Sequence, residues 1–173
     1  MFEEPKIALC PPLQQLQDEH VSLRASMDRF YEITEDLEYE SGPAVGPLFA
    51  RLHAQVASFA TLLAIHSYRE ETALFSLMAR RLGPEDRTIE TMEFEHEKAE
   101  QHLQDFLTQA AQAGSAVSED DARSIAVCAV QAHATLTQHF AKEEKMLFPL
   151  AETILSTHDK IALARQLLAS QQS

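Results

Sequence analysis

The 173-residue chain is long enough for one compact domain, and a hydrophobic content of 45% with only four glycines is typical of a helical protein. Aspartate and glutamate outnumber lysine and arginine by 27 to 14, and the resulting net charge of -13 argues against nucleic acid or an anionic membrane as a partner. We identify no apolar run long enough to span a bilayer, and the N-terminus is acidic where a secretory signal is basic, so we expect a cytoplasmic protein. The sequence leaves the oligomeric state open.

Apolar residues recur at spacings of three and four through almost the whole chain, which predicts helices that each bury one face. Residues 1–11 are expected to be a loose lead-in. The first helix is predicted to carry inward residues from Leu13 to Leu37 and to end at Ser41-Gly42-Pro43. The second helix is predicted to end at Gly83-Pro84. Its expected inward stripe is Leu48, Leu52, Gln55, Phe59, Leu62, His66, Glu70 and Leu77.

The second half of the chain repeats this organisation. A third helix is predicted between Ile89 and Gly114, and Ser118 is a suitable N-cap for a fourth helix that runs to Ile154. Ser156-Thr157 is predicted to cap a short fifth helix. Because short connections favour antiparallel neighbours, the expected fold is all-α: an up-down-up-down four-helix bundle at residues 12–155, followed by a C-terminal helix at residues 156–173.

Strongly polar side chains interrupt the apolar stripes at inward positions. They are His20, His66, Glu70, His96, His139 and Glu143. Each buried polar group left unpaired would cost about 1–3 kcal/mol, so these side chains need partners. Histidine and glutamate are ligands of transition metals, and a metal centre is therefore the simplest common partner. The alternative is a coincidental set of core polar residues.

The spacing and the heights of these residues support a shared site. The histidine and the glutamate of each pair, on the second and the fourth helix, are four residues apart and point from adjacent turns of one helix face. At ~1.5 Å per residue, His20 and His66 both lie roughly 30 Å from the turn that joins their helices. The same count places His96 and His139 roughly 26 and 32 Å from the turn between theirs. We therefore expect all four histidines in one layer.

An internal repeat strengthens this prediction. Glu19-His20 matches Glu95-His96, and both halves contain the pattern His-x3-Glu-Glu-x2-Leu-Phe, from His66 to Phe75 and from His139 to Phe148. A duplicated helical hairpin would place two metal ions side by side, with one carboxylate from each half able to bridge them.

With these motifs, the chain resembles the hemerythrin family, specifically its HHE cation-binding domains, over about residues 12–155. The resemblance implies a non-haem di-iron centre with two iron ions bridged by an oxo or hydroxo group. His20 and His66 would be the terminal ligands of one iron, and His96 and His139 those of the other. The glutamate of each repeat would bridge the two ions.

The sequence also departs from the oxygen-carrying hemerythrins. These proteins have a second histidine one turn after the third-helix ligand, where this chain has Glu100. Whether Glu100 is a ligand stays open. The missing histidine leaves an open position on iron, which favours binding of, or reaction with, a small diatomic or peroxide ligand (O2, NO or peroxide) in a stress response or in iron handling.

Other functions and another metal remain as alternatives. The chain could be an iron or oxygen sensor without turnover, or a structural bundle in which the histidines are incidental. Iron and manganese both accept this ligand set. Glu71 and Glu144 are expected to support the ligands from outside or to face solvent. A wall that excludes water is expected from Phe59, Met92, Phe140 and Phe148.

Overall fold

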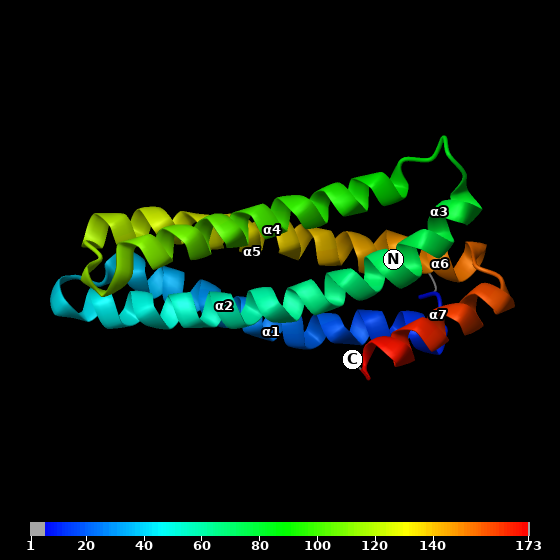
Figure 1. Ribbon diagram of the computed structural model, residues 1–173, viewed down its shortest axis with the longest axis horizontal. Helices are drawn as coiled ribbons and strands as arrows, with labels where there is room; N and C mark the ends of the chain where they lie inside the picture. Colours follow the sequence, from blue (N-terminus) through cyan, green and yellow to red (C-terminus); the bar gives the residue numbers. More distant parts are fainter. Residues whose placement is uncertain (1–5, 173) are drawn as a thin grey trace, which may run out of the picture.

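The structure, a computed structural model, describes residues 6–172 as an up-down-up-down helical bundle (Figure 1). Its long helices are α1 (Pro11–Tyr39), α2 (Val45–Arg69), α4 (Thr88–Ala113) and α5 (Glu119–Lys142). Two shorter helices, α3 (Ser76–Leu82) and α6 (Phe148–Ile154), extend α2 and α5, and α7 (Thr157–Ser170) follows at the C-terminal end. The predicted all-α bundle with a short C-terminal helix is confirmed. Residues 1–5 of the predicted lead-in, and residue 173, lie outside the described part of the chain.

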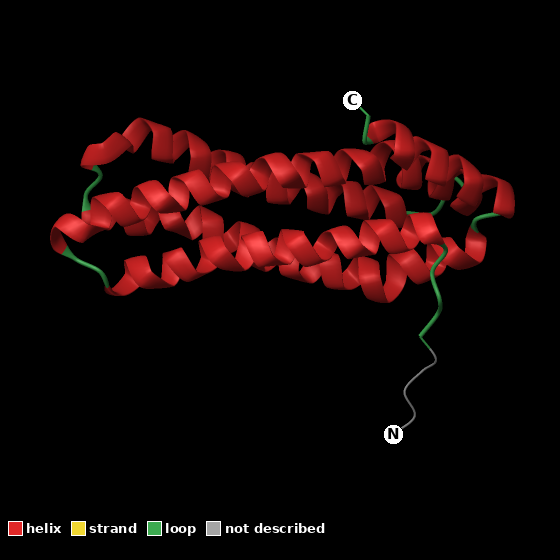
Figure 2. Ribbon diagram, turned by 90° about the horizontal axis from the view of Figure 1, so that it is seen from below, coloured by secondary structure: helices red, strands yellow, loops and turns green. Residues whose placement is uncertain are grey.

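The helices begin and end near the N-cap and helix-terminating residues of the sequence. Figure 2 shows the connections confined to the two ends of the bundle. Gly83 ends α3 with a φ of 86°, and Gly114 ends α4 with a φ of 63°; residues with a Cβ rarely adopt such values. The hydroxyl of Ser118 accepts a hydrogen bond from the amide of Asp121 and caps α5. Ser156 and Asp159 form a capping box at the start of α7.

The predicted inward stripes of α1 and α4 are buried at every position, from Leu13 to Leu37 and from Ile89 to Ala110. The prediction for α2 is wrong in part, because Leu62 is 45% exposed and Leu63 takes its place in the core with 2% exposure. At 3.6 residues per turn, two adjacent apolar stripes can both be drawn through Leu52 and Phe59. Only packing against the neighbouring helices selects between them.

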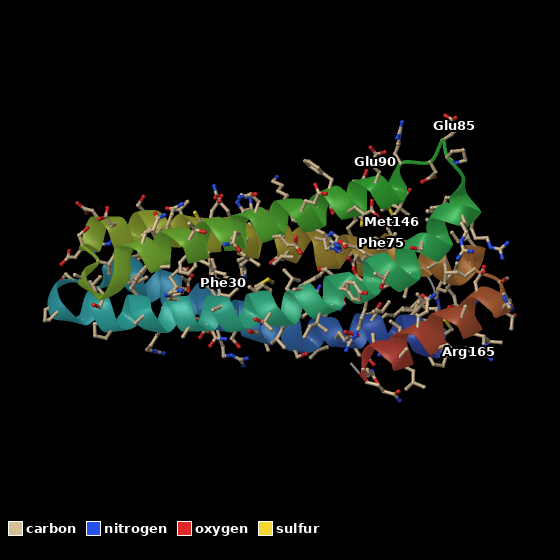
Figure 3. All side chains as sticks on the ribbon, viewed as in Figure 1. Phe30, Phe75, Glu85, Glu90, Met146 and Arg165 are labelled. Carbon is tan, nitrogen blue, oxygen red and sulfur yellow. The ribbon has the colours of Figure 1, made fainter. Side chains whose placement is uncertain are left out.

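The apolar core is divided into two clusters along the bundle. One cluster fills the half that contains Phe30, Phe59 and Phe106, and the other fills the half that contains Phe75 and Phe148. Figure 3 labels one phenylalanine from each cluster, Phe30 and Phe75, well separated along the bundle. The layer between these clusters holds the polar side chains that interrupt the stripes.

One expectation about the membrane needs correction. By length and composition alone, the continuous helix Gly42–Leu82 contains an apolar window that could cross a bilayer, and 28% of that window is buried inside the bundle. A core helix of a soluble bundle passes the same test. The inward face of this helix packs in the core through Phe49, Leu52 and Phe59, and the segment also carries the buried Glu70, which is consistent with a soluble protein.

Two π-helical turns interrupt the long helices, and no sequence pattern predicted them. They span Glu70–Phe75, between α2 and α3, and Glu143–Leu147, between α5 and α6. Each π turn begins at a glutamate of the repeat and inserts one extra residue into the helix, which changes the direction of the side chains that follow. Such turns occur frequently at functional sites.

Candidate metal centre

The six polar side chains come from all four long helices of the bundle. His20 lies on α1, His66 on α2, His96 on α4 and His139 on α5. Glu70 and Glu143 are the first residues of the two π turns. All six are buried, with exposed fractions of 3% or less. The structure therefore brings the predicted residues into the layer between the two apolar clusters.

Within this layer the side chains form two groups that could each hold a metal ion. One group is His20, His66, Glu70 and Glu143, and the other is Glu70, His96, His139 and Glu143. Within each group the ligand atoms all lie within 4.8 Å of one another. Both glutamates belong to both groups, so the geometry is that of two neighbouring cation sites with two shared carboxylates.

The two groups are related by an approximate twofold symmetry. The Nε2 atom of His20 lies 3.2 Å from Oε2 of Glu143, and the Nε2 atom of His96 lies 3.3 Å from Oε2 of Glu70. The rings of His20 and His66 have centroids 4.9 Å apart, and those of His96 and His139 have centroids 4.6 Å apart. The duplicated sequence thus produces duplicated geometry.

Several polar atoms at the centre lack a hydrogen-bond partner among residues 6–172. Both carboxylate oxygens of Glu70 and Glu143, and Nε2 of His139, are buried without one. The Nε2 atoms of His20 and His66 face each other at 3.2 Å. Unsatisfied buried acceptors and inward-facing imidazole nitrogens are costly on their own, but they are the donor set of a bound transition-metal ion. The residues present therefore fit two metal ions.

Electrostatics in this layer shows how two buried carboxylates are balanced. Burial alone would lower the pKa of His20, but Glu143 and Glu70 outweigh it and raise the pKa to about 9. The same opposition of burial and carboxylates raises the pKa of His66 to about 10 and that of His96 to about 11. Burial would raise the pKa of Glu70, but the neighbouring imidazoles hold it well below its usual range. Without bound metal, protons on the imidazoles thus provide the positive charge that metal ions would otherwise supply.

Each histidine contacts a further carboxylate through its outer ring nitrogen, Nδ1. The outer partner of His66 is Glu19, at 3.4 Å, and that of His139 is Glu95, at 2.8 Å. These two glutamates are the acidic residues of the repeated Glu-His dipeptides, and each serves a histidine of the neighbouring helix. In both cases the glutamate also forms an ion pair with a cationic side chain: Arg69 pairs with Glu19, and Lys142 pairs with Glu95. This role of Glu19 and Glu95 was not predicted, although the repeated Glu-His dipeptide indicates it.

The remaining two histidines use the glutamates that follow the shared ligands. Nδ1 of His20 lies 3.4 Å from Glu144, and Nδ1 of His96 lies 2.8 Å from Glu71. A histidine that binds metal through Nε2 carries its proton on Nδ1 and donates it to such a carboxylate, which fixes the ring and raises its basicity as a ligand. Of the two roles left open for Glu71 and Glu144, the structure shows contact with the ligands.

Aromatic rings cover the histidines from the apolar side. Phe140 stacks on His20 with centroids 4.3 Å apart, and Phe148 lies 5.7 Å from the same ring. In the other half, Phe75 stacks on His96 at 5.4 Å. Phe75 was missing from the predicted wall, although it matches Phe148 in the repeat.

Glu100 lies outside the centre. It is exposed and belongs to neither group of possible ligands; it lines a surface groove between α2 and α4. Its neighbour Ala99 is the residue of that turn that faces inward, with no exposed surface. The turn after His96 thus supplies no fifth nitrogen ligand. The chain's other histidines, His53, His102, His133 and His158, also lie outside both groups.

Comparison with known families agrees with this geometry. The sequence model of the family described as the Hemerythrin HHE cation binding domain matches residues 12–151. The matched range contains all six residues of the centre, together with the four carboxylates that contact the histidines from outside. No curated protein matches the sequence.

Proposed function

The chain belongs to the hemerythrin family of HHE cation-binding domains, and on this premise we propose that it is a non-haem di-iron protein that binds or reacts with a small species such as O2, NO or peroxide. The terminal ligands are His20 and His66 for one iron and His96 and His139 for the other. The shared carboxylates, Glu70 and Glu143, could bind both ions. A cytoplasmic role in oxidative or nitrosative stress, or in iron handling, is part of the same proposal.

One observation carries this proposal: two four-residue ligand groups are buried and share both of their carboxylates. Nitrogen and oxygen donors in this ratio suit iron, and two bridging carboxylates are the arrangement of di-metal helical bundles. When bound, such a pair of ions supplies redox chemistry and coordination positions for a small ligand.

The protein's own residues leave room for such a ligand. Each group offers two imidazoles and two carboxylates, fewer donors than the six positions of an octahedral iron. The turn after His96 adds no ligand, because Ala99 faces inward and Glu100 faces outward. The aromatic rings of Phe75, Phe140 and Phe148 exclude bulk water from the layer.

Metal analysis and spectroscopy test the proposal. The purified chain is reconstituted with Fe(II) without oxygen, its metal content is measured, and visible spectra are recorded before and after adding air, nitric oxide or peroxide. We expect two irons per chain and a spectral change with at least one of the three species. Because manganese accepts the same ligands, reconstitution with Mn(II) is run in parallel.

A matched pair of variants identifies the site. His66→Ala removes a buried member of one ligand group, whereas His102→Ala removes a histidine outside both groups. We expect metal loss only in the first variant. A wild-type chain that binds no iron, or equal metal content in both variants, contradicts the proposal.

A sensor without turnover is the second candidate, and the divided core favours it. The polar layer separates two apolar clusters, and it holds two buried carboxylates whose charge needs compensation. Metal ions would link the four helices at this layer, so occupancy and folding should be coupled. Helicity and melting temperature that rise with iron, without consumption of peroxide or nitric oxide, would support the sensor; consumption would support reaction.

A further inference from the structure

Helix α7 lies outside the range that the family model matches. The match ends at residue 151, and α7 begins at Thr157. Figure 1 shows α7 folded back along the end of the bundle that holds α3 and α6, next to α1. Its buried leucines, Leu163 and Leu167, belong to the apolar cluster of Phe75 and Phe148 on one side of the polar layer. A segment that the family match does not include is thus part of the core beside the metal centre.

Polar contacts fix the N-terminal half of α7. Nε of Arg81, on α3, donates a hydrogen bond to Asp159 at 2.7 Å. Nζ of Lys160 donates a hydrogen bond to Glu152, on α6, at 2.8 Å. Helix α7 also contacts the π turn Glu70–Phe75, which begins at a shared ligand. These contacts join α7 to the segments that extend α2 and α5.

The last turn of α7 reaches the metal centre through a chain of polar contacts. Oγ of Ser170 accepts a hydrogen bond from Nε of Arg69 at 3.1 Å. Nη1 of the same guanidinium donates a hydrogen bond to Oε1 of Glu19 at 2.6 Å. That oxygen lies 3.4 Å from Nδ1 of His66. Two side chains, Arg69 and Glu19, therefore connect α7 with a residue of the metal centre.

Arg69 holds Glu19 in its orientation toward the imidazole. Oε1 of Glu19 serves both Arg69 and His66, whereas Oε2 is buried without a hydrogen-bond partner among residues 6–172. The contact with Arg69 is the shorter of the two and joins two charged groups, so it is the stronger restraint on the carboxylate. The side chains of Arg69 and Glu19 are only 16% and 21% exposed, so water screens this pair in part.

The equivalent chain in the other half of the centre uses a lysine. Lys142 matches Arg69 in the repeat and pairs with Glu95, the outer partner of His139. Its side chain is 39% exposed, against 16% for Arg69. A lysine ammonium is one compact charge, whereas a planar guanidinium can hold two acceptors in fixed directions. The arginine thus stands in the half where a second acceptor, Ser170, is present.

A groove lies beside this chain of contacts. It has a volume of about 810 Å³ and is lined by Tyr68, Arg69 and Thr72 on one wall and by Gln166 and Ser170 of α7 on the other. The hydrogen bond between Arg69 and Ser170 joins the two walls. Because the groove is open to solvent, a substitution at this contact does not require repacking of the core.

From these contacts we infer that α7 is coupled to the metal centre: through Ser170 and Arg69, its last turn orients Glu19 and so strengthens metal binding at the position held by His20 and His66. Arg69 is a positioning residue, because it acts on the ligand His66 only through Glu19. The position held by His96 and His139 has its own lysine and does not depend on this contact. The inference rests on the proposed di-metal function.

Two variants that each keep one metal position separate the effects on the two ions. His139→Ala leaves the position held by His20 and His66, and His66→Ala leaves the other. Fe(II) affinity is measured without oxygen by competition with a coloured chelator, and circular dichroism checks that each protein keeps its helices. An effect through Glu19 is confined to the His139→Ala protein, whereas a general loss of stability lowers Fe(II) affinity in both proteins.

Substitutions at Arg69 and Ser170 are made in both of these proteins. Arg69→Gln removes the cation that holds Glu19 and should weaken Fe(II) binding to the His139→Ala protein about 10- to 100-fold. Arg69→Lys keeps a cation but not the second donor, and Ser170→Ala removes only the acceptor on α7, so each should weaken binding there about 3- to 10-fold. Ser170→Thr keeps the hydroxyl and should keep the Fe(II) affinity. In the His66→Ala protein, none of these substitutions should change it.

Matched controls make the same changes away from the chain of contacts. Arg51→Lys lies at an exposed position of α2, and Ser124→Ala lies at an exposed position of α5. Both should leave Fe(II) affinity unchanged in both proteins.

Failure of the inference is distinguishable from failure of the proposed function. A wild-type chain that holds no Fe(II) refutes the function itself. If wild type holds two ions but Ser170→Ala or Arg69→Lys binds Fe(II) as the controls do, or if the loss is equal in both proteins, the coupling to α7 is overturned. The same conclusion follows if removal of one histidine releases both ions, because the inference requires positions that respond separately. A loss confined to the His139→Ala protein supports it.

Discussion

The register of α2 decides which way His66 points, and two adjacent leucines test that register. Leu63 is 2% exposed and Leu62 is 45% exposed. Leu63→Ala removes about three buried carbon groups, which costs about 2.5 kcal/mol of transfer free energy and, with the cavity left behind, about 3–4 kcal/mol in total. Leu62→Ala should cost about 1 kcal/mol or less, because its side chain already meets water.

Urea unfolding of the metal-free proteins, followed by the circular dichroism of the helices, measures the difference. If the free energy of unfolding falls by about 2.5 kcal/mol for each molar of urea, a loss of 3 kcal/mol moves the midpoint by about 1.2 M. The slope should stay the same in both variants. Equal midpoint shifts, or a larger shift for Leu62→Ala, would refute the observed register and with it the inward direction of His66.

Three further predictions follow from the same structure. Glu70→Ala removes a ligand shared by both groups and should lose both metal ions, whereas removal of a terminal histidine should spare one; elemental analysis of each variant checks this. In the metal-free protein, pKa values raised from 6.5 to about 9 at His20 and about 11 at His96 give stability that is complete below pH 6.5 and is lost as pH rises through 9 to 11. The melting temperature should therefore fall over that range, and bound metal, which replaces the protons, should flatten the profile. Gly83→Ala should destabilise by about 1–3 kcal/mol because φ is 86° there, whereas Gly46→Ala, inside α2, should be neutral or stabilise by about 0.5–1 kcal/mol in thermal unfolding.

Local sequence patterns determined the helices and their ends. The helix ends depend on glycines, prolines and N-cap serines whose effect is confined to a few residues, and Gly83, Gly114 and Ser118 act where the sequence predicts. The polar residues that interrupt the stripes were visible for the same reason, since a histidine such as His20 at an inward position is a local exception. The repeated His-x3-Glu pattern then indicated a shared site without knowledge of any contact.

Tertiary packing decided between alternatives that local sequence patterns cannot distinguish. Two apolar stripes on α2 fit the helical period equally well, one through Leu62 and one through Leu63. Packing against the neighbouring helices buries the stripe that contains Leu63. The contact of Glu71 with His96 depends on residues brought together from separate helices. Periodicity fixes which residues share a face, but only the assembled bundle fixes which face meets which neighbour.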